Sequence, residues 1–286
     1  MFRISELTGR PYLDEVTALL QRLRQEHPTS GPWEAADYQW WWRLPRSTDD
    51  QPKVFWYDEQ GPVAAAVTTD WGSATWIDLI VLPSVRPHLI RPVIDRGLEL
   101  SRTDASPLEM LVGDEDEALI ELLRHAGFQQ EQADATAWMQ AASAPDVISL
   151  ADRYSLQSRA NNSSPDHPYE LMTPEVERRL GETSLYRPDL DLTVVDDQGV
   201  GAAHAIFWFD PSTGIGLVEP MGTLESHRGR GLARHLLTAG IQALVAAGSD
   251  RIKVSWDLDN RPAVALYLGA GFKPTTTSSL WAAPTN

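Results

Sequence analysis

The chain contains no cysteine and no long apolar run. The absence of cysteine excludes disulfide bonds, thiolate metal sites and a cysteine nucleophile. The first ten residues, MFRISELTGR, lack the apolar core of a signal peptide, and no segment reaches the length of a membrane span. We therefore expect a cytoplasmic protein with no membrane partner.

Basic residues are also scarce. The 24 Lys and Arg are outnumbered by 40 Asp and Glu, which gives a net charge of −16 over 286 residues. This balance argues against nucleic acid or an anionic membrane as a partner. It also makes the pair Arg228 and Arg230 locally unusual, which favours a specific anion there. The length allows one large domain or two ordinary ones, and 42% hydrophobic residues with 11 Trp suffice for their cores.

The sequence from Val218 to Leu237 predicts a strand, a tight basic loop and a helix. The strand should end near Thr223, and the loop runs from His227 to Gly231. Apolar residues then recur at helical spacing: Leu232, Leu236, Leu237, Ile241, Leu244 and Val245. Gly229 and Gly231 allow the backbone to approach a ligand, and the first N–H groups of a helix have no intrahelical acceptor. The pattern is typical of an anion site suited to a pyrophosphate.

A second motif follows at a fixed distance, after a strand predicted for Arg251–Trp256. Together the two motifs resemble the GNAT superfamily of N-acetyltransferases. The pattern R/Q-x-x-G-x-G/A is met by Arg228, Gly231 and Ala233. The pattern N-x-x-A-x-x-L-Y-x-x-x-G-F is met by Asn260, Ala263, Leu266, Tyr267, Gly271 and Phe272.

This resemblance implies that acetyl-CoA is the cosubstrate and that an amine attacks its thioester directly, without an acyl-enzyme and without a metal. By resemblance, the strand end would present backbone groups to the pantetheine arm and the thioester, through Met221, Gly222 and Thr223. The loop and helix start would hold the pyrophosphate, through Arg228, Gly229, Arg230, Gly231, Leu232, Ala233 and Arg234. Asn260 and Ala263 would complete the coenzyme site, and Asn260 could cap the helix that follows it, contact the pantetheine arm, or do both.

Two residues are candidates for catalysis. Glu219 lies beside Leu217 and Val218 in an apolar strand, where an unpaired charge is costly, so it is a candidate general base. Pro220 after it indicates a bulge that could aim the carboxylate. The alternatives for Glu219 are a structural pairing with an arginine and a role as an N-cap-like acceptor. Tyr267 is the candidate general acid for the departing thiolate, with a core tyrosine as its alternative.

The chain also repeats itself. Ala126-Gly-Phe128 followed by Trp138 matches Ala270-Gly-Phe272 followed by Trp281, at an offset close to 144. We therefore predict an α/β (α+β) fold with two tandem GNAT-like domains, residues 1–142 and 147–286, each a mixed, mostly antiparallel sheet flanked by helices. A strand ending near Trp138 should close the first half.

The first copy lacks the features of a coenzyme site. Pro87 and Leu89 stand where the second copy has Gly229 and Gly231, and Leu123 replaces Tyr267. We expect this copy to be structural or to shape the acceptor pocket. The layout is similar to that of mycothiol synthases, a likeness that does not fix the substrate.

A Trp-rich segment from Trp33 to Leu44 belongs to the first half. In a helix, Trp40, Trp41 and Trp42 would point about 100° apart and could not share one core, so at least one should meet another domain, a pocket or solvent. Packing between domains and a ligand pocket both remain open for this segment.

The sequence thus predicts an acetyl-CoA-dependent N-acetyltransferase that acts on a small-molecule or peptide amine. Transfer of a longer acyl group is equally compatible with the motifs. The alternative from another class is a non-catalytic acyl-CoA-binding module, which would have no need of Glu219 and Tyr267. A tandem chain can bury its own pseudo-dimer interface, which favours a monomer.

Overall fold

The structure is a computed structural model that describes residues 2–101, 107–162, 167–168 and 172–284. Its contacts divide the chain into two units, which are described separately. The first comprises Met1–Tyr38, Pro45–Asp134 and Thr276–Asn286. The second comprises Gln39–Leu44 and Ala135–Thr275.

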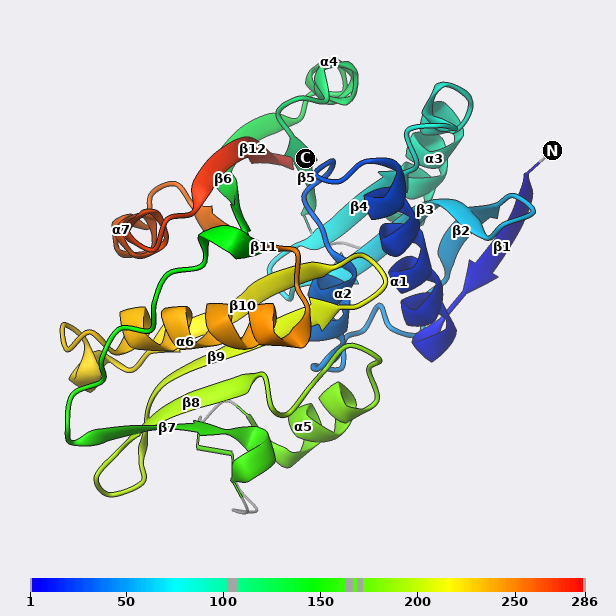
Figure 1. The fold of residues 1–286 in the computed structure, drawn as a ribbon. Coiled ribbons are helices and arrows are strands. Elements are labelled where there is room, and N and C mark those ends of the chain that lie inside the picture. Colours follow the sequence, from blue (N-terminus) through cyan, green and yellow to red (C-terminus); the bar gives the residue numbers. More distant parts are fainter. Residues whose placement is uncertain (1, 102–106, 163–166, 169–171, 285–286) are drawn as a thin grey trace. The chain divides into compact units, whose positions relative to one another are not determined.

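The first unit is built on a mostly antiparallel sheet. Strands β1 to β4 pair antiparallel in sequence order, and β4 then pairs with β5 in parallel. Helices α1 and α3 both pack on β3 and β4 (Figure 1). The elements in order are β1 (Arg3–Leu7), α1 (Gly9–Glu26), α2 (Ala35–Trp42), β2 (Lys53–Tyr57), β3 (Pro62–Asp70), β4 (Thr75–Val81), α3 (Arg86–Ser101), β5 (Leu108–Gly113), α4 (Glu117–His125) and β6 (Gln129–Gln140).

The second unit repeats this plan. Strands β7 to β10 pair antiparallel in order, and β10 pairs with β11 in parallel. Helix α6 lies along β8, β9 and β10 (Figure 1), where Gly240 leaves room for the Phe207 ring of β9. The elements are β7 (Tyr154–Ser158), α5 (Pro174–Gly181), β8 (Asp191–Asp196), β9 (Gly201–Asp210), β10 (Ile215–Thr223), α6 (Leu232–Ala247), β11 (Arg251–Asp257), α7 (Arg261–Gly269) and β12 (Lys273–Ala282). The predicted fold class is confirmed.

The last strand of each sequence half is exchanged between the units, which corrects the expectation that the strand near Trp138 closes the first half. Ser278–Ala282 of β12 pairs antiparallel with β5, and Trp281 packs in the first unit's core with Phe128. Conversely, the part of β6 that includes Trp138 belongs to the second unit, where β6 neighbours β11. Both units therefore contain chain from each side of residues 143–146. Alternating apolar and polar residues predict that a strand forms, but they do not predict which strand pairs with it.

The Trp-rich segment is helix α2, and its C-terminal part belongs to the second unit. Trp40, Trp41 and Trp42 are 6%, 8% and 7% exposed, so none of them points into solvent. The Arg179 guanidinium of α5 lies 4.0 Å from the centre of the Trp42 ring and donates to the Trp42 carbonyl at 2.6 Å. These tryptophans thus pack into the unit that follows them in sequence, as the interdomain interpretation requires.

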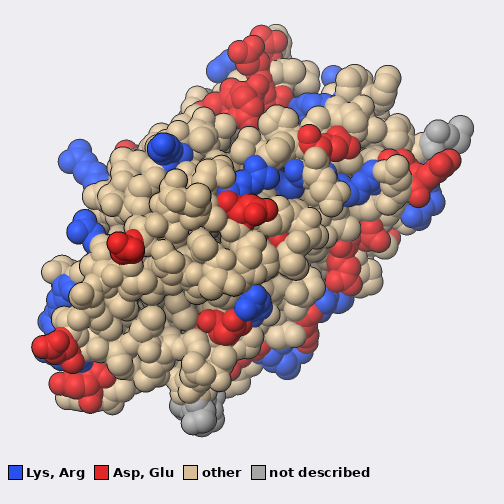
Figure 2. Space-filling view, in the orientation of Figure 1, with Lys and Arg blue, Asp and Glu red and all other residues tan. Residues whose placement is uncertain are grey.

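Charged side chains are scattered over the face shown in Figure 2. Acidic and basic groups alternate there among uncharged residues, and the described residues of that face form no extended basic patch. In the described part of the chain, every helix is too short or too polar to cross a bilayer.

Candidate active site

The site begins where the parallel strands of the second unit separate. Strands β10 and β11 pair only from Ile215 to Leu217, and the pairing of β10 with β9 shifts register between Val218 and Met221. The bulge predicted from Pro220 lies at this shift. Past it, β10 and β11 diverge and leave a cavity of about 790 Å³. Its walls are Met221, Gly222, Thr223, His227, Arg228, Gly229, Gly231, Leu232, Ala233, Arg234, Asn260, Pro262, Ala263, Ala265, Leu266 and Tyr267.

Every predicted site residue except Glu219 and Arg230 lines this cavity. Glu219 lies on β10 near the point where β10 and β11 part. Arg230 points toward Tyr154 of β7. The sequence motifs, which are separated by an intervening strand, therefore converge on one space. His227 of the loop and Leu266 of the second motif also line the cavity, as do Pro262 and Ala265, which are not fixed positions of either motif.

The glycine loop has the backbone that an anion site requires. Gly229 and Gly231 have φ of +75° and +78°, a left-handed conformation that other residues rarely adopt. Gly231 is the N-cap of α6 and offers no side chain for capping. The first N–H groups of α6, which have no intrahelical acceptor, therefore start at the cavity wall. Arg228 and Arg234 are exposed on the same wall and supply positive charge.

The loop is fixed from β7. Arg230 donates to the Tyr154 hydroxyl at 2.8 Å and to the Ser226 carbonyl at 3.2 Å. The Tyr154 oxygen also lies 3.0 Å from Nδ1 of His227. Tyr154 was missed by the sequence analysis, because a tyrosine far from the motif gives no local signal of its contact.

Tyr267 also lines the cavity, from helix α7. Its ring stacks on Trp256 at 5.4 Å between centroids, and Phe272 meets its edge at 6.0 Å. Its hydroxyl points toward Sδ of Met221, 4.0 Å away. Burial, followed by the negative charge of Glu219, raises the pKa of Tyr267 above its usual value. The phenol therefore keeps its proton at neutral pH.

Helix α7 carries Tyr267 and begins at a capping asparagine. The Asn260 side chain accepts from the Ala263 N–H at 3.2 Å, and it also lines the cavity. The capping role considered for Asn260 is confirmed. Because Asn260 fixes the first turn, it also sets the position of Tyr267 two turns later.

The backbone of Glu219 is held by a hydrogen bond from a buried tryptophan. The Trp208 indole donates to the Glu219 carbonyl at 2.5 Å, and Trp208 is buried. The Glu219 side chain is half-buried, and its charge acts on Tyr267 as described above. The carboxylate of Glu219 thus lies close enough to the phenol of Tyr267 for its charge to act on it.

Polar residues that the motifs do not include lie beside the strand end. The His204 ring occupies the space next to Gly222, where an added Cβ would lie 2.5 Å from Cε1 of the imidazole. Burial lowers the pKa of His204 to about 4, so it is neutral at pH 7. Asp191 accepts from the Tyr186 hydroxyl at 2.7 Å and lies 3.2 Å from Nε2 of His167. The polar segment 161–167 (NNSSPDH) predicts a loop from its composition, and part of it lies outside the described residues.

The first unit contains a smaller counterpart. Strands β4 and β5 pair only at Thr75–Trp76 and then part around a cavity of about 300 Å³. Arg86, opposite Arg228 in the repeat, forms an ion pair with Asp116. Asp116 caps α4 by accepting from the Leu119 N–H at 3.3 Å, as Asn260 caps α7. Arg86 is therefore paired with the residue that stands in place of the asparagine in the repeat.

Comparison with known proteins gives one family. Residues 154–272 match the Acetyltransferase (GNAT) family. The chain is 39% identical over 80 residues to a mycothiol acetyltransferase from Corynebacterium aurimucosum, which covers 28% of this chain and 26% of that protein. It is 32% identical over 130 residues to a mycothiol acetyltransferase from Beutenbergia cavernae, which covers 45% and 43%. Each match thus spans less than half of the relative's length.

Solved structures show the fold over the whole chain. A tandem GNAT protein from the clavulanic acid biosynthesis pathway superposes with a TM-score of 0.72 at 17% identity, covering 100% of both chains. A GCN5-related N-acetyltransferase from Sphaerobacter thermophilus gives 0.64 at 16% identity, covering 98% of this chain and 95% of that one. The chain therefore has the fold of a tandem GNAT protein, and its residues 154–272 match the GNAT acetyltransferase family.

Proposed function

We propose that this protein transfers the acetyl group of acetyl-CoA to the amine of a small molecule or peptide, in the cavity of the second unit. The proposal depends mainly on one observation: the left-handed glycine loop and the Tyr267 hydroxyl line the same cavity of about 790 Å³. The glycine loop suits a pyrophosphate, and the Tyr267 hydroxyl offers a proton donor. The relatives' name, mycothiol acetyltransferase, supports acetyl as the group transferred.

The residues that would hold the cosubstrate fit its chemistry. Arg228, Arg234 and the N–H groups after Gly231 match a pyrophosphate in charge and in hydrogen-bond direction. The open edge of β10 at Met221–Thr223 would bind the pantetheine amides, since β10 has already parted from β11 there. Acetyl-CoA supplies the activated thioester.

The chain's own groups would move the protons. The Glu219 carboxylate accepts the proton that an ammonium must lose before its nitrogen can attack, directly or through a water. As the new C–N bond forms and the C–S bond breaks, the Tyr267 hydroxyl donates its proton to the departing sulfur. The raised pKa of Tyr267 suits this donor role, because the phenol remains protonated until the thiolate appears.

The first test is calorimetric titration of acetyl-CoA into the wild type and into Gly231→Leu. The substitution forces a side chain onto a left-handed backbone at the cavity wall. Gly199→Leu is a matched control, because Gly199 has a φ of +80° and equally open surroundings in the β8–β9 turn. We expect one binding site in the wild type and the control, and none in Gly231→Leu.

Other results would change the proposal in defined ways. Two sites in the wild type would mean that the first unit also binds the coenzyme. One site without turnover of any amine tested would favour the non-catalytic acyl-CoA-binding module. An absence of binding in the wild type would contradict the proposal altogether.

A further inference from the structure

The first unit's cavity lies outside the proposed acetyl-transfer site and has different walls. It opens where β4 and β5 part and measures about 300 Å³, within the range of small-ligand pockets. Apolar side chains of α1 and α4, Leu20, Leu23 and Leu119, form much of its lining. Trp33 and Asp78 lie on the same wall. The cavity therefore combines an apolar body with an aromatic ring and one buried acid.

Asp78 is a buried carboxylate without a cation beside it. It is 3% exposed and accepts from the Trp33 indole at 2.9 Å and from the Tyr38 hydroxyl at 2.7 Å. Both donors are neutral, and none of the ion pairs among the described residues includes Asp78. A buried charge in this state is costly unless a cation compensates it. Two donors also leave the carboxylate able to accept further hydrogen bonds.

The charge on Asp78 persists at neutral pH. Burial raises its pKa to about 6, while the hydrogen bonds from Tyr38 and Trp33 oppose that rise. At pH 7 most molecules thus hold a negative charge at the cavity wall. An anion such as a pyrophosphate would be repelled there, and the arginine on the wall, Arg86, is already paired with Asp116.

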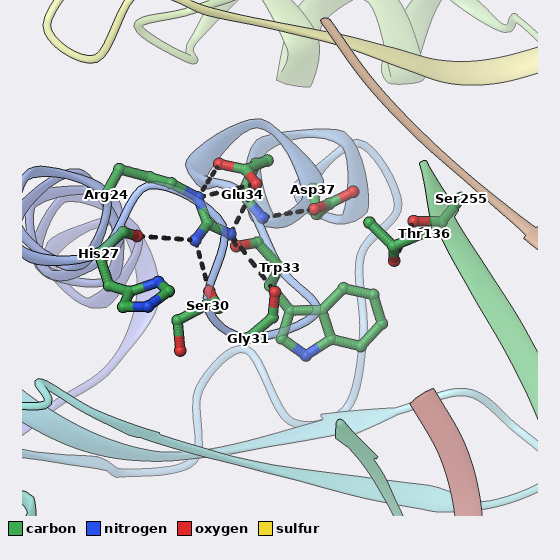
Figure 3. Close-up of polar contacts among 9 residues, drawn as sticks. All are labelled: Arg24, His27, Ser30, Gly31, Trp33, Glu34, Asp37, Thr136 and Ser255. Carbon is green, nitrogen blue, oxygen red and sulfur yellow. Dashed lines mark hydrogen bonds and ion pairs between the residues drawn. The ribbon is translucent and has the colours of Figure 1, made fainter. Parts of the chain in front are cut away.

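The loop that carries Trp33 is held by several polar contacts of Arg24 (Figure 3). The Arg24 guanidinium is 3% exposed and forms an ion pair with Glu34 at 2.7 Å. It also donates to Trp33's carbonyl at 2.9 Å, so the loop after α1 closes around it. Further carbonyls that accept from Arg24 belong to His27, Ser30 and Gly31. Arg24 is therefore committed to Glu34 and the loop, and it holds the backbone of Trp33, whose indole contacts Asp78.

We propose that the cavity of the first unit binds an organic ammonium ion, with its charged group at Asp78 and its apolar part against Leu20, Leu23 and Leu119. The ammonium supplies the missing positive charge, and the leucines exclude water from the rest of the ligand. This inference does not depend on acetyl transfer in the second unit.

The test measures the binding of three small molecules to the full chain. The three have similar shapes but different charges. The probes are phenethylammonium, neutral 2-phenylethanol and anionic phenylacetate, and the readout is the indole N–H resonance of Trp33 in protein labelled with ¹⁵N-tryptophan. Trp33→Phe identifies that resonance by its loss. We expect phenethylammonium to shift it in a saturable manner, and the alcohol and the anion to leave it unchanged.

Two variants locate the binding. Asp78→Asn keeps the side-chain shape and one acceptor oxygen, and it should weaken phenethylammonium binding about tenfold or more. Glu219→Gln, in the second unit, should leave the Trp33 shift and its affinity unchanged. Equal shifts from the amine and the alcohol, or no shift from the amine, would overturn the proposal without any variant. Unchanged affinity in a folded Asp78→Asn protein would also overturn it.

Discussion

The Arg230 guanidinium of the glycine loop donates a hydrogen bond to the phenolic oxygen of Tyr154 at 2.8 Å. The same oxygen lies 3.0 Å from Nδ1 of His227, whose ring meets the tyrosine edge to face. Strand β7, far earlier in the chain, thus ties both ends of the basic loop. Of the two arginines in the loop, Arg230 bonds to Tyr154, whereas Arg228 lines the cavity.

Tyr154→Phe should loosen this loop without touching the cavity wall. It removes the acceptor of Arg230 and the partner of His227, and each neutral or charge-assisted hydrogen bond contributes about 1–2 kcal/mol. We expect acetyl-CoA affinity, measured by calorimetry, to fall about three- to tenfold. Tyr57→Phe, which removes a hydroxyl bonded to Glu15 in the first unit, is the control and should bind normally. Equal affinities in the two variants would show that β7 does not position the loop.

Tyr267→Phe should separate binding from chemistry. The ring contacts with Trp256 and Phe272 survive the substitution, so the cavity keeps its wall. Only the proton donor is lost, and such a group contributes about 10²- to 10⁴-fold to a rate. We expect kcat to fall within that range while the acetyl-CoA dissociation constant changes less than about twofold. A wild-type kcat would remove Tyr267 from the mechanism.

Glu219→Gln should produce a defect that high pH repairs. Without the carboxylate, an ammonium must lose its proton to solvent, which becomes easier as the pH approaches the amine's own pKa. We therefore expect kcat/KM to fall about 10²-fold or more at pH 7 and to rise steeply with pH in the variant. Glu225→Gln, at an exposed position of the turn Glu225–His227, is the matched control. A pH–rate profile parallel to the wild type would exclude Glu219 as the base.

Asp78→Asn should stabilise the protein most at high pH. The folded-state pKa of Asp78 is raised to about 6 from 3.8, so between these values the folded state binds more protons than the unfolded state. Stability therefore falls as the pH rises through this window, and the loss is complete above about pH 7. We expect the free energy of unfolding of the variant, relative to wild type, to increase by up to about 3 kcal/mol from pH 4 to pH 8. Urea unfolding at both pH values measures it, and a difference independent of pH would contradict the prediction.

The strand exchange predicts which unit each repeated tryptophan stabilises. Trp281 is 3% exposed in the first unit's core, whereas Trp138 packs near Arg251 and Lys253 in the second. Trp281→Ala should cost about 3–5 kcal/mol and reduce hydrogen-exchange protection in β5 first. Trp138→Ala should reduce it in β11 first. The opposite pattern would mean that each half keeps its own last strand.

Local signals were sufficient for the elements and for most of the site. The apolar stripe after Gly231 predicted α6, and the glycines predicted a tight loop, which the structure shows to be left-handed at Gly229 and Gly231. The spacing between Arg228 and Tyr267 matched the pattern of one family, and residues of both motifs line one cavity. The repeat likewise predicted two similar sheets, since a repeated pattern of apolar residues repeats its secondary structure.

Other features depend on residues that approach each other only after folding. Neither Tyr154 nor Asp78 stands in a motif, and their partners come from segments far away in sequence. The exchange of β6 and β12 is of the same kind: Trp138 and Trp281 look equivalent in the repeat, and either could close either sheet. The sequence by itself thus determined the elements, the repeat and the chemistry of the loop, because these follow from neighbours along the chain. Only the tertiary structure decided which strand completes which sheet and which buried charges are compensated, because backbone pairing and burial energy depend on what packs alongside.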